Sequence, residues 1–130
     1  MSIYKKIIEL ENCNKPFVIV SVINTTGHVP GKVGFKMIVE ADGKSTGTVG
    51  GGAIEQEAIS ESIRQLNKGE HLTKEYILSD KVDKSTGNVI PMSCSGKVEI
   101  FYEVHGNNPT VYIYGGGHVG NALLHFLSPL

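Results

Sequence analysis

The chain has 130 residues and a formal net charge of −1. Its 40% hydrophobic and 19% charged residues are typical of a globular protein. Its length suffices for one domain and part of a second. A charge so close to zero provides no basic surface, so we expect no nucleic acid and no anionic membrane as a partner. The longest apolar run, FVIVSVI at residues 17–23, is too short to cross a bilayer.

The first predicted elements are a short helix and a buried strand. Residues 2–11 place three apolar side chains on one helical face, those of Ile3, Ile7 and Leu10. Acidic residues near the end of this segment interrupt the apolar core that a signal peptide would need. Residues 17–25, FVIVSVINT, are rich in β-branched residues and have almost no polar alternation. They predict a central strand that is covered on both faces.

A loop and a hairpin follow this strand. Residues 26–34, TGHVPGKVG, are punctuated by glycine and proline and predict a loop. Lys32 in this loop is a candidate phosphate ligand, although a loop lysine is more often simply solvated. Asp42 and Gly43, between the β-rich runs FKMIVE and KSTGTV, are a strong signal for the tight turn of a β-hairpin.

Three consecutive glycines precede the next predicted helix. The stretch TVGGGAIE at residues 48–55 leads into a helix predicted for residues 53–68, which Gly69 closes. A helix N-terminus offers unpaired N–H groups and the positive end of the helix dipole. A phosphate can approach this end without meeting a Cβ atom, because the residues there are Gly50, Gly51 and Gly52.

Glu55 is the unusual member of this stretch. On a helical wheel it lies in the middle of the stripe formed by Ala58, Ile59, Ser62, Ile63 and Leu66, and the opposite, solvated side carries Glu57, Ser60, Glu61, Arg64 and Lys68. A buried carboxylate is costly unless it is paired or hydrogen-bonded. Glu55 therefore either locks the glycine loop by accepting its N–H groups or pairing with a lysine, or accepts hydrogen bonds from a heterocycle or ribose-like group. The pattern leaves both interpretations open.

A second candidate region lies at the end of residues 80–96, which predict a long polar loop ending in MSCSG. Cys94, followed by Ser95 and Gly96, is a candidate reactive thiol because a loop exposes it and a lysine follows shortly. A half-buried packing residue is an equally good interpretation. We interpret Cys13 as structural, and two cysteines so far apart predict neither a disulfide framework nor a metal site and fit a reducing cytosol.

The end of the chain changes in character. Residues 97–104, KVEIFYEV, alternate strictly and predict a half-exposed antiparallel strand. A linker is predicted at residues 106–109, and residues 110–130 then read as a buried strand, a glycine turn and a helix. In this last segment G-x-G-x-x-G spacing is provided by Gly115, Gly117 and Gly120, with His118 inside the turn. It looks like the first βα unit of a Rossmann domain.

This second unit is incomplete as a nucleotide site. A dinucleotide fold needs a second strand and an acidic residue about 20 residues beyond the glycines, and residues 110–130 contain neither. We therefore expect the truncated start of a Rossmann-like α/β domain, and NAD-type dinucleotide binding by this chain is not expected. An incomplete strand–helix unit exposes apolar surface, so we also expect self-association into a homo-oligomer.

The ordered set of motifs resembles one family. GxxPxxxGxKM in the first loop, GGGxxE before the helix, CSG before the alternating strand and GGGHVG near the end are similar to the XdhC/CoxI family, the accessory factors of xanthine dehydrogenase and related molybdenum hydroxylases. The resemblance covers nearly the whole chain. It implies an α+β domain at residues 1–105, followed by the linker and the Rossmann-like start.

The resemblance also implies a function. Such a protein is a cytoplasmic chaperone rather than an enzyme. It binds the molybdenum cofactor (molybdopterin) transiently, protects it while a desulfurase installs its terminal sulfur, and hands it to the apo-hydroxylase. Carried onto this sequence, the cofactor-facing positions are Gly50, Gly51, Gly52, Glu55, Cys94, Ser95 and Gly96.

Two other classes of function stay open. The Rossmann-like start favours a nucleotide-binding oxidoreductase or a nucleotidyltransferase fragment, which would bind NAD or a nucleoside triphosphate. The exposed apolar unit favours a non-enzymatic interaction module that oligomerises.

Overall fold

The computed structural model describes residues 2–80, 88–92 and 94–106, which form a mixed α+β arrangement. The elements are α1 (Ile3–Asn12), β1 (Phe17–His28), β2 (Lys36–Glu40), β3 (Ser45–Gly47), α2 (Gly52–Lys68), β4 (Leu72–Ser79), β5 (Val89–Pro91) and β6 (Ser95–His105). The predicted Rossmann-like unit of residues 110–130, with Gly115, Gly117, His118 and Gly120, lies outside the described residues, as does the predicted linker beyond Gly106.

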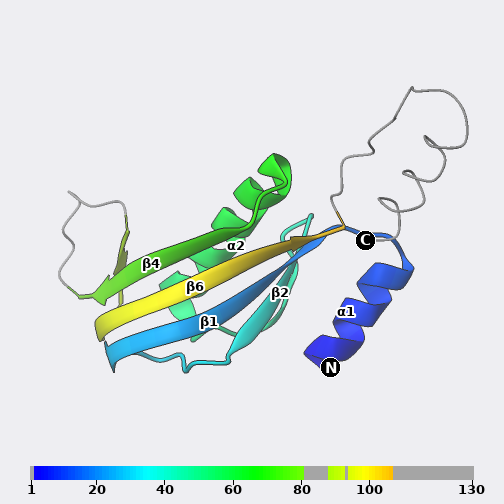
Figure 1. Cartoon of the computed structure of the whole chain (residues 1–130). Helices are drawn as coiled ribbons and strands as arrows, with labels where there is room; N and C mark the ends of the chain where they lie inside the picture. Colours follow the sequence, from blue (N-terminus) through cyan, green and yellow to red (C-terminus); the bar gives the residue numbers. More distant parts are fainter. Residues whose placement is uncertain (1, 81–87, 93, 107–130) are drawn as a thin grey trace, which may run out of the picture.

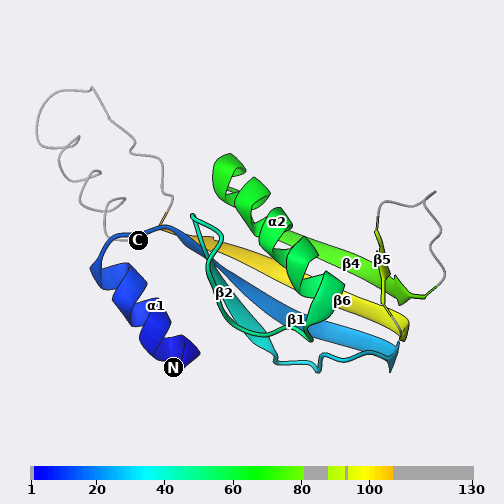
Figure 2. The same cartoon turned by 180° about the vertical axis from the view of Figure 1, so that it is seen from behind.

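One six-stranded sheet organises the described part, with the strand order β3-β2-β1-β6-β4-β5. Neighbouring strands are antiparallel except for β4 and β5, which are parallel. Figures 1 and 2, seen from opposite sides, show α2 lying across one face of the curved sheet and α1 beside the end where β1 begins. None of the helices in the described ranges is long and apolar enough to span a membrane.

The two helices cover opposite faces of β1. Alternate side chains of a strand point to opposite faces, so Val18, Val20 and Val22 join the main core with α2. Phe17 and Ile19 join a second cluster with the apolar face of α1, whose members are Ile3, Ile7 and Leu10, and with Ile38. The prediction of a central strand covered on both faces is confirmed for residues 17–22, whereas Ile23 and Asn24 are exposed. The predicted apolar face of the first helix is confirmed.

The other local signals also hold. β2 and β3 form the hairpin around Asp42 and Gly43, where Gly43 has φ 90° and the Asp42 carboxylate accepts the Lys44 N–H at 3.0 Å. α2 ends at Lys68, and Gly69 is in the left-handed conformation that closes a helix. In β6 the predicted inward face is observed, because Val98, Ile100 and Tyr102 are buried.

Two loop predictions were too long. β1 continues through residues 26–28, because these residues pair with residues 95–97 of β6. Ser95 and Gly96 therefore lie in a strand and not in the predicted loop of residues 80–96, which the short strand β5 also interrupts. Both extensions depend on pairing between distant segments, which local composition does not encode.

Glu61 corrects the predicted solvated face of α2. It is 4% exposed, and its carboxylate accepts hydrogen bonds from Arg64, Gln65 and Lys74 at 2.9–3.0 Å. Burial alone would raise the pKa of Glu61, but these hydrogen bonds outweigh burial and lower the pKa from 4.5 to about 2. The buried charge is tolerated because Lys74 of β4 reaches the Glu61 carboxylate. Glu61 therefore lies on the side of α2 that faces the sheet, and not on the predicted solvated side.

Candidate functional site

The sheet brings the three candidate loops to one end. β1 and β6 are antiparallel, so the end of β1 lies beside the start of β6, with His28 opposite Ser95. The first loop leaves from β1 there, and the CSG motif leads into β6 there. The glycine loop lies at the same end, where α2 begins (Figure 2).

The loops are in direct contact. A Cβ atom added to Gly31 would lie 2.5 Å from the Val49 carbonyl oxygen, and one added to Gly50 would lie 3.1 Å from Cγ of Pro30. One added to Gly52 would lie 3.3 Å from Cε of Met92. The first loop and the residues just before Cys94 therefore both pack against the glycine loop, and the close backbone approach requires glycine there.

The glycine loop has a backbone that other residues rarely adopt. Gly50, Gly51 and Gly52 have φ values of 130°, 79° and 60°. Gly51 is the N-cap residue of α2 with ψ 178°, a region that is essentially restricted to glycine, and it provides no side-chain cap. The cap of this helix must therefore come from elsewhere.

Glu55 provides part of that cap, at the N-cap residue itself. Its Oε1 atom accepts the N–H of Gly51 at 2.8 Å and the N–H of Val49 at 3.2 Å, and it also accepts the hydroxyl of Thr48. The Thr48 hydroxyl in turn accepts the N–H of Gly50 at 3.1 Å. Three consecutive amides of the loop are thus used by two side chains of the same chain, and the carboxylate is held against the positive end of α2.

This geometry matches the first of the two interpretations of Glu55, in which the carboxylate satisfies loop N–H groups. It also leaves donors and an acceptor open. Gly52 and Ala53 are the first helical residues, so their N–H groups have no acceptor within the helix, and no other described residue accepts them. The Oε2 atom of Glu55 makes no hydrogen bond within the described residues either.

The remaining predicted residues lie around this loop with less definite roles. Lys32 is exposed in the first loop. Cys94 is a free, half-buried thiol that packs against the main core, which matches the packing interpretation. Ser95 is exposed, and Gly96 lies so close to Thr26 of β1 that a side chain would collide with its carbonyl oxygen.

Sequence reasoning missed Thr48 and Met92. Thr48 carries a readable signal, since a threonine two residues before a glycine often bonds that residue's N–H in an ST-turn. Met92 carries none, because its contact with Gly52 joins residues far apart in the chain.

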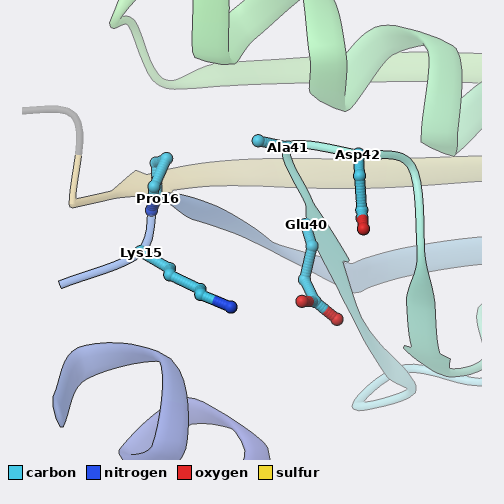
Figure 3. A pocket seen from close by; sticks show the side chains of 5 residues that line it. All are labelled: Lys15, Pro16, Glu40, Ala41 and Asp42. Atoms are coloured by element: carbon cyan, nitrogen blue, oxygen red, sulfur yellow. The ribbon is translucent and has the colours of Figure 1, made fainter. Parts of the chain in front are cut away.

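A shallow hollow of about 180 Å³ lies at the other end of β1, away from these loops. It is lined by Lys15, Pro16, Glu40, Ala41 and Asp42. Figure 3 shows the side chains of Lys15 and Glu40 reaching toward the same space. None of the candidate residues lines this hollow. No group of three or more metal-binding side chains occurs among the residues that the structure describes.

Comparisons with known proteins agree with the resemblance of the motifs. The model of the XdhC and CoxI family matches residues 11–76, which include the first loop, the glycine loop and all of α2. The uncharacterized protein YqeB of Escherichia coli (strain K12) is 30% identical over 123 residues, which are 95% of this chain and 22% of that protein.

The fold is similar to a solved structure as well. A protein from Bacillus halodurans described as a xanthine dehydrogenase superposes with a TM-score of 0.64 at 25% sequence identity. The match covers 80% of this chain and 30% of that chain. The chain therefore spans less than a third of the length of either relative.

Proposed function

This chain belongs to the XdhC and CoxI family, and from that premise we propose that it is an accessory factor that binds the molybdenum cofactor on behalf of a xanthine dehydrogenase-type molybdenum hydroxylase. The main support is the contact between two family motifs, the first loop and the glycine loop, together with Met92, which lies just before the CSG motif and contacts Gly52. Segments distant in sequence therefore meet at one end of the sheet.

The residues of this end fit the chemistry of the cofactor. Molybdopterin combines a flat heterocycle, whose edge carries N–H groups, with a phosphate. The backbone is open on one side, because a Cβ atom added to Gly51 would meet nothing within 4 Å and Gly52 is exposed. The amides of Gly52 and Ala53, which no described residue accepts, suit an anionic group at a helix N-terminus.

Each residue then has a definite task in the proposal. The amides of Gly52 and Ala53 hold the phosphate, and the exposed ammonium of Lys32 adds a compact positive charge beside it. The Oε2 atom of Glu55, which makes no hydrogen bond with the described residues, accepts an N–H from the edge of the pterin ring. The bound cofactor itself supplies the molybdenum chemistry of the enzyme that receives it, and this chain carries and shields it. Its terminal sulfur is installed by a separate desulfurase, and the apo-hydroxylase is the recipient.

A binding titration tests the proposal. Purified protein is titrated anaerobically with molybdopterin and followed by the absorbance of the pterin, and we expect saturable binding. Lys32→Ala should weaken the affinity about two- to five-fold, because an exposed charge contact contributes up to about 1 kcal/mol. Lys15→Ala, at the opposite end of the sheet, is the matched control and should leave the affinity unchanged. Absence of binding by the wild type, or equal losses in the two variants, would refute the proposal.

A further inference from the structure

The structure assigns Glu55 a task within this site that is distinct from contacting a ligand. We infer that Glu55 is a positioning residue. Its carboxylate is the anion that the N–H groups of the glycine loop bind, and it thereby determines where the loop places its neighbours. An external phosphate is then excluded from the amides of residues 49–51 and is left with those of Gly52 and Ala53. The inference rests on the proposed function only for the identity of the ligand.

The amides of the glycine loop at residues 49–51 already have acceptors. The N–H groups of Val49 and Gly51 both point to Oε1 of Glu55, at 3.2 and 2.8 Å. The N–H of Gly50 points to the Thr48 hydroxyl, which itself donates to the same Oε1 atom. A phosphate at these amides would have to displace a negative charge that is already held by three donors, and charge-assisted hydrogen bonds are the strongest kind.

The Glu55 carboxylate also holds the backbone of the loop. Gly50 and Gly51 have positive φ and precede the first residue of α2, so no helix or strand ladder holds them. Glycine adopts many backbone conformations at similar cost, so contacts with other residues decide which one the loop takes. The contacts of Glu55 come from a helix, which is a rigid support, and they fasten the loop at both ends of its turn, at Val49 and at Gly51.

The glycine loop connects Glu55 to the rest of the site. Val49 and Gly50 are the residues against which Pro30 and Gly31 pack, and Lys32 follows directly. A loop released from Glu55 therefore loses the surface that positions the Lys32 segment, as well as the orientation of the Gly52 amide. Glu55 acts on both through the backbone.

Chemical rescue separates this role from a general structural one. Amide signals are recorded by NMR for the wild type and for Glu55→Ala, with sodium formate as a small replacement carboxylate. In the variant we expect the proton signals of the Val49 and Gly51 amides to move upfield as their acceptor is lost, and formate should return them toward their wild-type positions in a saturable manner. Inorganic phosphate should leave these two amides unmoved in the wild type.

Glu57→Ala is the matched control, because Glu57 is a carboxylate of the same helix that bonds Arg64 at 2.9 Å instead of the loop. Its Val49 and Gly51 signals should stay at the wild-type positions with and without formate. If Glu55→Ala does not fold, Thr48→Val is used instead. It keeps the carboxylate but should shift the Gly50 amide, which loses its acceptor.

The inference is wrong if the Val49 and Gly51 amide signals do not move in Glu55→Ala, or if formate does not return them. It is also wrong if the Gly50 amide signal does not move in Thr48→Val, or if phosphate shifts the Val49 and Gly51 amide signals of the wild type. Failure of the proposed function is recognised separately. A wild-type protein that binds no molybdopterin, combined with successful formate rescue, refutes the cofactor and supports the role of Glu55.

Discussion

Replacement of Glu61 by glutamine tests the buried ion network between α2 and the sheet. The side chain of Glu61 is 6% exposed and lies 2.9 Å from Nζ of Lys74 and 3.0 Å from Nε of Arg64. Glutamine has nearly the same size but no charge. The substitution therefore removes the two ion pairs without creating a cavity, and it leaves the Lys74 ammonium without its counter-ion.

The expected magnitude follows from the pKa of Glu61, which the folded protein lowers from 4.5 to about 2. At about 1.4 kcal/mol for each tenfold change in proton affinity, this difference corresponds to about 3 kcal/mol. Because the folded-state pKa lies below the unfolded one, the contribution is complete above pH 4.5 and is lost as the pH falls toward 2. Glu61→Gln should therefore be less stable by about 3 kcal/mol at pH 7 and by much less near pH 2.

Urea unfolding followed by circular dichroism at a series of pH values measures this difference. Glu57→Gln is the control, because the Glu57 side chain is 27% exposed and pairs with the half-exposed Arg64, so that the change should stay below about 1 kcal/mol. A difference between wild type and Glu61→Gln that does not depend on pH would refute the reasoning, since the stabilisation would then not come from the charge.

Three further substitutions follow from the packing. Tyr102→Phe should lower the free energy of unfolding by about 1–3 kcal/mol, because it leaves the buried Tyr76 hydroxyl without its 2.7 Å partner. The double variant with Tyr76→Phe should lose less than the sum of the two single losses in urea unfolding, and additive losses would contradict the pairing. Gly31→Ala should lower both stability and cofactor affinity, because its Cβ would lie 2.5 Å from a backbone oxygen of Val49; an unchanged melting temperature would contradict that contact. Gly51→Ala should destabilise the protein by about 1–3 kcal/mol. The loss would come from backbone strain alone, since the new Cβ meets no atom within 4 Å. Calorimetry that finds no loss would contradict the φ of 79° at Gly51.

Much of the fold was readable from the sequence where the signals are local. The turn at Asp42 and Gly43 and the helix end at Gly69 depend on backbone conformations that few residues adopt, and composition alone identifies them. The central position of β1 was readable as well, because a strand buried on both faces cannot carry polar alternation.

The parts that were missed depend on distant partners. Glu61 appeared solvated because its counter-ion, Lys74, lies on another element. The extension of β1 to His28 and the start of β6 at Ser95 require each other, so neither is visible in its own segment. For Cys94 the sequence left the reactive-thiol and packing interpretations equal, and its contact with the core favours the packing one.

For the candidate site, the sequence named candidate residues but not the contacts between them. The helical period predicted that Glu55 points into the core, whereas its side chain is half-buried and bonds the glycine loop. The two interpretations of Glu55 were a carboxylate that satisfies the loop and a carboxylate that accepts from a ligand. In the structure Val49, Gly51 and Thr48 all donate hydrogen bonds to Oε1 of Glu55. The coordinates were needed to show that Oε2, and not Oε1, makes no hydrogen bond with the described residues.

The central claim is that the cofactor binds where the three loops meet, and amide NMR mapping with molybdopterin tests it most directly. The account predicts that the amide signals of Gly52, Ala53 and Lys32 shift on titration, while those of Ala41 and Asp42, which line the hollow at the opposite end of the sheet, stay in place. Shifts confined to Ala41 and Asp42, or a spectrum that molybdopterin leaves unchanged, would contradict it.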